Sequence, residues 1–261
     1  MSPQPHEAPA QRRAIKWYKK LTSRKGRLEN GCFLVEGIRA VRHIAHRQPN
    51  AIVEILYVGA PPPELRHLPL YSVTERQLSS IANSKSPPNV LAIVTSPPEI
   101  YSDVLPSEIG SHVLILEDVQ DPGNVGALIR TATALGFAGV ILSEKCADPL
   151  APKVVQATAG TVLSVWLRRT THYLDLLRAL QQKGFVCAAA DPYGQEDPSV
   201  LAQQSPLLLV LGNEAAGLSS TMQQIAEFRI KIPMRAGSES LNVATSGAIC
   251  MYVSTSHSPL S

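Results

Sequence analysis

The sequence lacks most features that mark secreted, metal-binding or membrane proteins. Its four cysteines are scattered and form no C-x-x-C pair, so we expect neither a structural disulfide nor a metal site. No apolar run approaches the length of a membrane span, and the N-terminus has no apolar signal-peptide core. These absences predict a cytoplasmic protein with no metal and no membrane association.

The glycines are spaced in a way that excludes a common cofactor-binding motif. None of the 16 glycines stands two positions from another, so the chain has no G-x-G turn of the Rossmann type. Its 44% apolar and 17% charged residues are ordinary for a globular protein. With 261 residues the chain is long enough for two domains, each with its own core.

Positive charge is concentrated near the N-terminus. Residues 1–47 contain eleven Lys or Arg and three acidic residues, a net charge of +8, whereas the remainder has a net charge of −5. Basic residues with interleaved aromatics, here Trp17 and Tyr18, suit phosphates and unstacked bases, so the segment indicates RNA binding. A solvated, mobile arm is a compatible interpretation. The predicted RNA-binding residues are Arg12, Arg13, Lys16, Lys19, Lys20, Arg24, Lys25 and Arg27.

Turn residues divide the chain near residue 100. Residues 1–11 are Pro-rich and polar, which predicts a disordered tail. Residues 12–97 alternate short apolar strands with helices and form the predicted RNA substrate-binding domain, and residues 98–110 have little periodicity and form the predicted linker. The elements expected in this α/β domain are strands at 33–37, 51–58, 70–73 and 90–94 and helices at 14–19, 38–46 and 75–81.

Apolar strands alternate with helices again over residues 111–261. The alternation predicts a parallel sheet covered on both faces, and unknotted connections are the general expectation for such a sheet. The expected strands are 113–116, 139–142, 162–166, 185–190, 207–211 and 228–232, and the expected helices are 125–135, 153–157, 173–183 and 242–253.

Three segments in this half place glycines and polar side chains where apolar elements end, which is where binding loops lie. The first holds Asn124 and Arg130, close enough on one helix for both side chains to point toward the same end. The second, residues 211–217, reads Leu-Gly-Asn-Glu-Ala-Ala-Gly. The third joins Ile-Pro-Met at 232–234 to Ser-Leu-Asn-Val at 240–243.

Together these segments resemble the three motifs of the SpoU (TrmH) family of RNA ribose 2′-O-methyltransferases, within the knotted SPOUT class. Three motifs in the family's order make a chance match improbable. The N-terminal pattern, with Phe-Leu-Val-Glu-Gly at 33–37 as its best signature, resembles the substrate-binding domain of such enzymes, which is similar to RNA-binding ribosomal proteins. The resemblance implies a deep C-terminal trefoil knot in a methyltransferase domain over residues 111–261, and a homodimer formed through that domain.

The resemblance also implies S-adenosyl-L-methionine as cofactor and roles for single residues. Arg130 would hold an RNA phosphate and stabilise the developing oxyanion, since a guanidinium keeps its proton. Helix capping by the asparagines, turn geometry at the glycines and core packing of the apolar residues are simpler alternatives. The other implied catalytic residues are Asn124, Glu214, Ser240 and Asn242. The implied cofactor-binding residues are Leu211, Gly212, Asn213, Gly217, Ile232, Met234, Leu241, Thr158 and Gly160.

We therefore expect an enzyme that methylates a ribose 2′-hydroxyl in structured RNA. Large-subunit (23S-type) rRNA is favoured because the tRNA-directed members of the family use short basic extensions in place of an N-terminal domain. A tRNA 2′-O-methyltransferase and an antibiotic-resistance rRNA methylase are alternatives of the same class. A non-catalytic RNA-binding or ribosome-assembly factor is the alternative from another class, and the full set of candidate catalytic residues counts against it.

Overall fold

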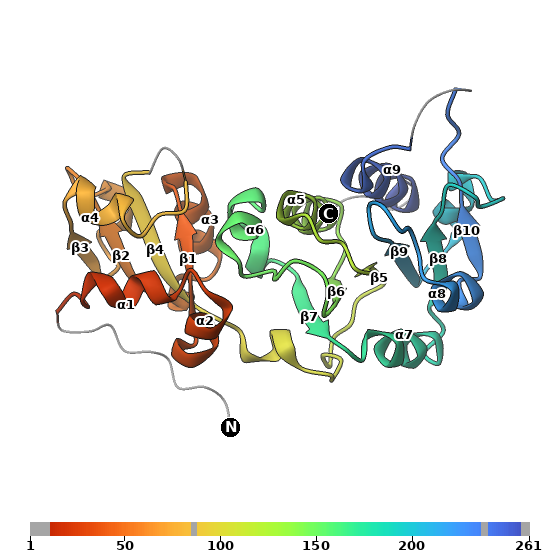
Figure 1. Cartoon of the computed structure of the whole chain (residues 1–261), viewed down its shortest axis with the longest axis horizontal. Helices are drawn as coiled ribbons and strands as arrows, with labels where there is room; N and C mark the ends of the chain where they lie inside the picture. The colour runs from red at the N-terminus through yellow and green to blue at the C-terminus, as the bar shows by residue number, and fades with distance from the viewer. Residues whose placement is uncertain (1–10, 85–87, 236–239, 257–261) are drawn as a thin grey trace. The chain divides into compact units, whose positions relative to one another are not determined.

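The structure, a computed structural model, describes residues 11–84, 88–235 and 240–256 (Figure 1). It divides into two compact units. Unit 1 comprises Met1–Pro98 and Asp148–Leu163, and unit 2 comprises Glu99–Ala147 and Ser164–Ser261. Within the described ranges, no helix is long and apolar enough to cross a membrane. The predicted disordered tail lies outside the described residues except for its last position.

Unit 1 is built on a mixed four-stranded sheet in the order β1-β4-β2-β3. Strand β4 runs antiparallel to both of its neighbours, and the edge strand β3 runs parallel to β2. The order and type of these elements confirm the prediction except for α2, a helix that was not predicted. The elements are α1 (Ile15–Lys20), α2 (Arg24–Asn30), β1 (Cys32–Glu36), α3 (Ile38–Arg47), β2 (Ile52–Tyr57), β3 (Leu70–Ser72), α4 (Glu75–Ser79) and β4 (Val90–Thr95).

The basic N-terminal segment of unit 1 is folded as two helices on this sheet. Tyr18 and Leu21 are fully buried in a core cluster with Leu34, Leu56 and Leu91 of the strands. Each of these strands is buried along most of its length, so its residues read as apolar runs without clear alternation. The burial of one aromatic residue of the basic segment anchors that segment to the unit.

The segment Asp148–Leu163 packs in unit 1 although it lies between two strands of unit 2. It carries α6 (Pro152–Ala157), which packs on β1. Gln48 donates a 2.8 Å hydrogen bond to the Leu163 carbonyl. Gly160 has φ +96°, and a Cβ there would lie 2.8 Å from the Ala40 carbonyl oxygen, so only glycine fits this close approach.

Unit 2 contains a six-stranded sheet in the order β10-β8-β9-β5-β6-β7. Every neighbouring pair of strands is parallel, which confirms the predicted parallel α/β architecture. Its strands are β5 (His112–Leu116), β6 (Gly139–Ser143), β7 (Trp166–Thr170), β8 (Val186–Ala190), β9 (Leu207–Leu211) and β10 (Phe228–Ile230). Its helices are α5 (Pro122–Ala134), α7 (Tyr173–Gln181), α8 (Ser220–Ile225) and α9 (Val243–Thr255).

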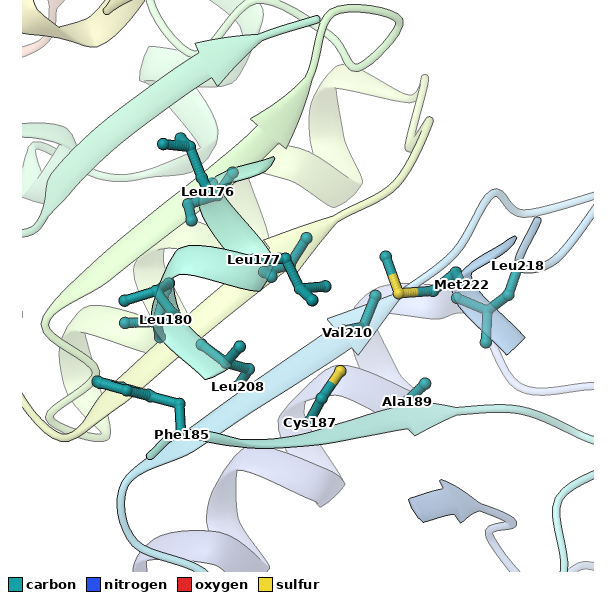
Figure 2. Close-up of a cluster of buried hydrophobic side chains, with 13 residues drawn as sticks. Leu176, Leu177, Leu180, Phe185, Cys187, Ala189, Leu208, Val210, Leu218 and Met222 are labelled. Carbon is teal, nitrogen blue, oxygen red and sulfur yellow. The ribbon is translucent and has the colours of Figure 1, made fainter. Parts of the chain in front are cut away.

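Helices cover both faces of this sheet, with α7 and α8 on one side and α5 and α9 on the other (Figure 1). Figure 2 shows α7 leucines such as Leu177 pointing toward Leu208 and Val210 of β9. On the other face, a Cβ on Gly247 would lie 2.4 Å from the Leu128 side chain. Glycine therefore lets α9 approach α5 closely, and this contact holds two motif-bearing helices together.

The expected strand at 162–166 is wrong, because the strand is Trp166–Thr170 and residues 161–163 form a 3₁₀ turn. The observed strand contains Arg168 and Arg169, both largely buried. Their guanidinium groups donate to backbone carbonyls, including those of Val104 at 2.6 Å and Cys146 at 3.2 Å. A pattern based on apolar residues misses a strand whose charges are buried with such partners. The short helix α8 was not predicted either.

Candidate active site

A pocket of about 740 Å³ opens at the carboxyl edge of the unit 2 sheet. Its wall is formed by the segments that follow β8, β9 and β10 and by the start of α9. Open parallel sheets bind ligands at this edge. The predicted catalytic and cofactor-binding residues that line it are Leu211, Gly212, Asn213, Glu214, Gly217, Ile232, Met234, Ser240, Leu241 and Asn242.

The Gly-Asn-Glu segment after β9 is a tight backbone cradle. Asn213 and Gly217 exchange two backbone hydrogen bonds of 3.0 Å, and the Asn213 side-chain oxygen accepts the N–H groups of Ala215 and Ala216. Gly217 has φ +69°, and a Cβ on Gly212 would lie 2.6 Å from the Gly217 backbone. Turn geometry thus requires both glycines, and it brings the backbone of Gly212 and Gly217 close together in the pocket wall.

A line of hydrogen bonds joins three of the predicted catalytic residues. Asn242 donates to the Asn124 side-chain oxygen at 3.0 Å, and Asn124 donates to Glu214 at 3.0 Å. Asn242 also caps α9 by accepting the Ala244 N–H at 2.8 Å. The cap of α5 is Asp121, which accepts the Asn124 N–H. The side chain of Asn124 is therefore not the cap of α5. It instead connects the N-terminal end of α5 to the cradle through Glu214.

Glu214 is held as a carboxylate by its neighbours. Burial acts to raise its pKa, but the hydrogen bond from Asn124 and the N–H groups of Gln120 and Asp121 outweigh it, so the pKa lies below the ordinary value. The other charged residue of the lining is Asp191, and no Lys, Arg or His lines the pocket among the described residues. Because Arg229 forms an ion pair with Asp191, the net negative charge of the described lining comes from Glu214.

The remaining four predicted site residues lie outside the lining. Arg130 is exposed on α5, and within the described part of the chain its side chain makes no hydrogen bond or ion pair. Thr158 and Gly160 belong to unit 1, where Thr158 is buried and donates to the Val155 carbonyl at 2.7 Å. Asn124 reaches the pocket residues through Glu214 and Asn242 only.

The predicted RNA-binding residues fall into two groups. Arg27 is 3% exposed and donates to Asp148 at 2.9 Å, and Arg13 pairs with the buried Glu54 and lies over the Trp17 ring. These two arginines hold unit 1 together. Arg12 is half-buried and Arg24 lies 4.0 Å from the same Asp148 carboxylate. The exposed side chains are Lys16, Lys19, Lys20, Arg24 and Lys25.

Sequence reasoning missed two anchors of the pocket loops. Glu117, 3% exposed at the end of β5, accepts the Tyr173 hydroxyl at 2.5 Å and the Ser219 N–H at 2.8 Å, which fixes the chain just after the cradle. Asp191 begins the loop after β8 and is bound by Arg229. The run Asp-Pro-Tyr-Gly after an apolar strand was a turn signal that could have drawn attention to this loop.

Comparison with known proteins decides between the remaining interpretations. Residues 111–252 match the SpoU rRNA methylase family, and residues 12–92 match the MRM3-like substrate binding domain. The chain belongs to the SpoU rRNA methylase family. The resemblance inferred from the three motifs and from the N-terminal pattern is thus confirmed.

Relatives in this family match nearly the whole chain. The sequence is 31% identical to the 23S rRNA (guanosine(2553)-2′-O)-methyltransferase RlmP of Bacillus subtilis, over 93% of this chain and 96% of that protein. It is 30% identical to the 23S rRNA (uridine(2479)-2′-O)-methyltransferase of Streptomyces viridochromogenes, over 90% and 86%. The similarity therefore includes both units.

Solved structures of family members share the fold. The SpoU methyltransferase AviRb from Streptomyces viridochromogenes, in complex with AdoMet, superposes with a TM-score of 0.78 at 27% identity and covers 93% of this chain and 97% of its own. The AdoMet-bound rRNA methyltransferase from Sinorhizobium meliloti gives a TM-score of 0.79 at 28% identity and covers 95% of each chain.

Proposed function

We propose that this protein transfers a methyl group from S-adenosylmethionine to a ribose 2′-hydroxyl of 23S rRNA. The observation that carries the proposal is the pocket at one sheet edge, whose walls contain the second and third family motifs. The first motif is joined to them through the hydrogen bonds of Asn124 to Glu214 and Asn242. Two relatives that match over most of their length, from Bacillus subtilis and Streptomyces viridochromogenes, are 23S rRNA 2′-O-methyltransferases, which supports the substrate.

The residues of the pocket fit this cofactor. The cofactor supplies a methyl group on a positively charged sulfonium. Among the described residues the lining contains no cation, and its Glu214 carboxylate forms no ion pair. Backbone groups at Leu211, Ile232 and Leu241 would hold the adenosine part, and Gly212 allows its close approach. Solved family members of the same fold contain AdoMet, which supports the assignment.

Arg130 is the proposed catalytic residue, although it does not line the pocket of its own chain. Its guanidinium would bind the RNA phosphate and stabilise the oxygen as it loses its proton to phosphate or water, since an arginine cannot accept that proton. The line from Asn242 through Asn124 to Glu214 would keep the start of α5 in register with the cradle. Ser240 lies at the pocket edge beside Asn242.

The proposed active form is a homodimer in which Arg130 acts in the pocket of the partner subunit. Helix α9 is apolar on average and leaves Tyr252 65% exposed, as expected of a helix face covered in an assembly. Light scattering should give twice the mass of the chain. Arg130→Ala should be nearly inactive, and Gly212→Ala should be poorly active when S-adenosylmethionine is limiting. Mixing equal amounts of the two under that condition should restore activity to about a quarter of the wild-type level, because half of the dimers are then heterodimers with one intact site. Activity of the mixture no higher than the average of the two variants contradicts action across the interface.

A C-terminal trefoil knot and a cytoplasmic location are further parts of the proposal. Family membership supports the knot, as does the convergence of the segments after β9 and β10 on one pocket. The domain limits at 12–97, 98–110 and 111–261 stay predictions, with matches over 12–92 and 111–252 in their support.

Methyl transfer to purified RNAs tests the proposed function. The protein should move tritium from labelled S-adenosylmethionine into a 23S rRNA transcript and not into 16S rRNA or tRNA. The matched control is the Arg130→Ala variant, which should leave all three RNAs unlabelled. Labelling of tRNA alone would contradict the proposed substrate.

A further inference from the structure

Exposed apolar side chains gather at the candidate pocket. Of the six large hydrophobic residues that are exposed in the described ranges, three line it: Tyr193, Met234 and Leu241. Tyr193 is the most exposed at 83%, against 40% and 38% for the other two. The tyrosine side chain therefore lines the pocket and is at the same time largely accessible to solvent.

The backbone beneath Tyr193 is held in place. Asp191 is 5% exposed and accepts two hydrogen bonds from the Arg229 guanidinium, at 2.9 and 2.7 Å, and one from the Tyr193 N–H at 2.8 Å. Gly194 donates to the Asp191 carbonyl, and a Cβ on Gly194 would lie 2.3 Å from the Arg229 carbonyl oxygen. The turn that carries Tyr193 is thus held against β10 by these contacts, so its backbone position is fixed.

The charge of the pocket restricts which part of an RNA can approach the ring. In the part of the chain described, the lining has no cation, Asp191 is ion-paired with Arg229, and Glu214 adds a negative charge. Such a lining does not attract phosphate. An unpaired base is neutral and has a π face that stacks on tyrosine. Proteins that read single-stranded RNA commonly hold splayed bases in this way.

We propose that Tyr193 is the stacking platform for the base of the nucleotide that receives the methyl group. The subsite binds an unpaired nucleobase and orients its ribose toward the cofactor. The inference rests on the proposed function and deepens it, because it assigns the contact that holds the target nucleotide. Tyr193 is a binding residue for RNA in this account and has no part in holding the cofactor.

Three substitutions separate stacking from other roles. At saturating S-adenosylmethionine, Tyr193→Ala should lower kcat/KM for a 23S rRNA transcript about five- to 150-fold, the effect of losing one base–aromatic stack. Tyr193→Phe keeps the ring and should keep the wild-type value, whereas Tyr193→Leu, apolar but not aromatic, should resemble the alanine variant. Calorimetry with S-adenosylhomocysteine should give one Kd for all four proteins, and their thermal unfolding should coincide.

Several results would overturn the inference. An unchanged kcat/KM in Tyr193→Ala, or a leucine variant as active as wild type, would exclude stacking. A weaker S-adenosylhomocysteine Kd in step with activity would assign the ring to the cofactor's adenine instead.

Ultraviolet cross-linking decides the matter without turnover. In the presence of S-adenosylhomocysteine, 23S rRNA should cross-link to the peptide that contains Tyr193, and a cross-linked set without that peptide contradicts the proposal. A wild-type protein that transfers no methyl group would refute the proposed function, while the cross-link would still report on the subsite.

Discussion

Units 1 and 2 differ in where their charged side chains are placed. Unit 1 contains the basic N-terminal segment, yet Arg13 and Arg27 of that segment are bound to Glu54 and Asp148. Unit 2 contains the pocket, whose lining has no cation among the described residues. A basic residue in the sequence is therefore not by itself an RNA contact. The proposed RNA affinity of unit 1 therefore rests on its exposed basic side chains, whereas the proposed cofactor site of unit 2 is lined by residues without positive charge.

Removing Arg130 should have the largest effect on activity, because it is the exposed cation that this account assigns to chemistry. Arg130→Ala should lower the rate of methyl transfer about 10²–10³-fold, as expected for the loss of a donor to a developing oxyanion. S-adenosylhomocysteine binding should stay near the wild-type value, since Arg130 lies outside the lining. A tritium-transfer assay and calorimetry measure the two effects. Arg130→Lys keeps the charge without the planar fork and should recover part of the rate; equal losses of rate and cofactor affinity would place Arg130 in the cofactor pocket.

Removing Arg27 should affect stability more than RNA recognition. Arg27→Ala removes the guanidinium that lies 2.9 Å from the Asp148 carboxylate. The free energy of unfolding should fall by about 3 kcal/mol, which is the lower end of the range for a broken buried ion pair. The lower end is expected because Arg24 remains 4.0 Å from the same carboxylate. Urea denaturation measures the loss. Lys20→Ala removes the same charge from an exposed position and should change stability by less than about 0.5 kcal/mol. Equal effects of the two variants would show that Arg27 has no structural role.

The fold was predictable where strands are uninterrupted apolar runs. Leu207–Leu211 is buried at every position and was predicted with its observed limits. The strand β7 was not predicted at its observed position because it contains Arg168 and Arg169. Their burial depends on backbone carbonyls of loops distant in the sequence, which accept their hydrogen bonds. The motif loops were found because each follows a strand, so the edge of a parallel sheet brings them together. The membership of Thr158 and Gly160 in unit 1 depends on contacts such as that with Ala40, which no local pattern encodes.

Two glycines of the cradle should respond differently to the same substitution. In Gly212→Ala the new Cβ would lie 2.6 Å from the Gly217 backbone, so the cradle must shift. The Kd for S-adenosylhomocysteine should rise about tenfold or more, which corresponds to a loss of binding free energy above about 1.4 kcal/mol. In Gly217→Ala no atom lies within 4 Å of the new Cβ, and the cost is only the strain of φ +69°, about 1 kcal/mol. Calorimetry on both variants compares them. A Gly217→Ala variant with the larger loss would contradict the described shape of the cradle.

Neutralising exposed lysines of unit 1 should have the smallest effect per residue. Lys16→Gln, Lys19→Gln and Lys20→Gln should each weaken binding of all RNAs similarly and reduce the slope of log K against log salt by roughly one unit per lost phosphate contact. Filter binding at several salt concentrations measures the slope. Lys183→Gln, exposed in unit 2, is the matched control and should leave it unchanged. A slope that is unaffected by the three changes together would exclude α1 from the RNA interface.

Mass spectrometry of nucleosides from 23S rRNA, after incubation with deuterated-methyl S-adenosylmethionine, tests the central claim most directly. The account predicts one labelled nucleoside whose trideuteromethyl group stays with the ribose fragment when the glycosidic bond is broken. The label should fall to near background in Arg130→Ala, and at limiting S-adenosylmethionine it should fall about tenfold or more in Gly212→Ala. A trideuteromethyl group on a base fragment, or no labelled nucleoside with wild-type protein that binds S-adenosylhomocysteine, would contradict the account.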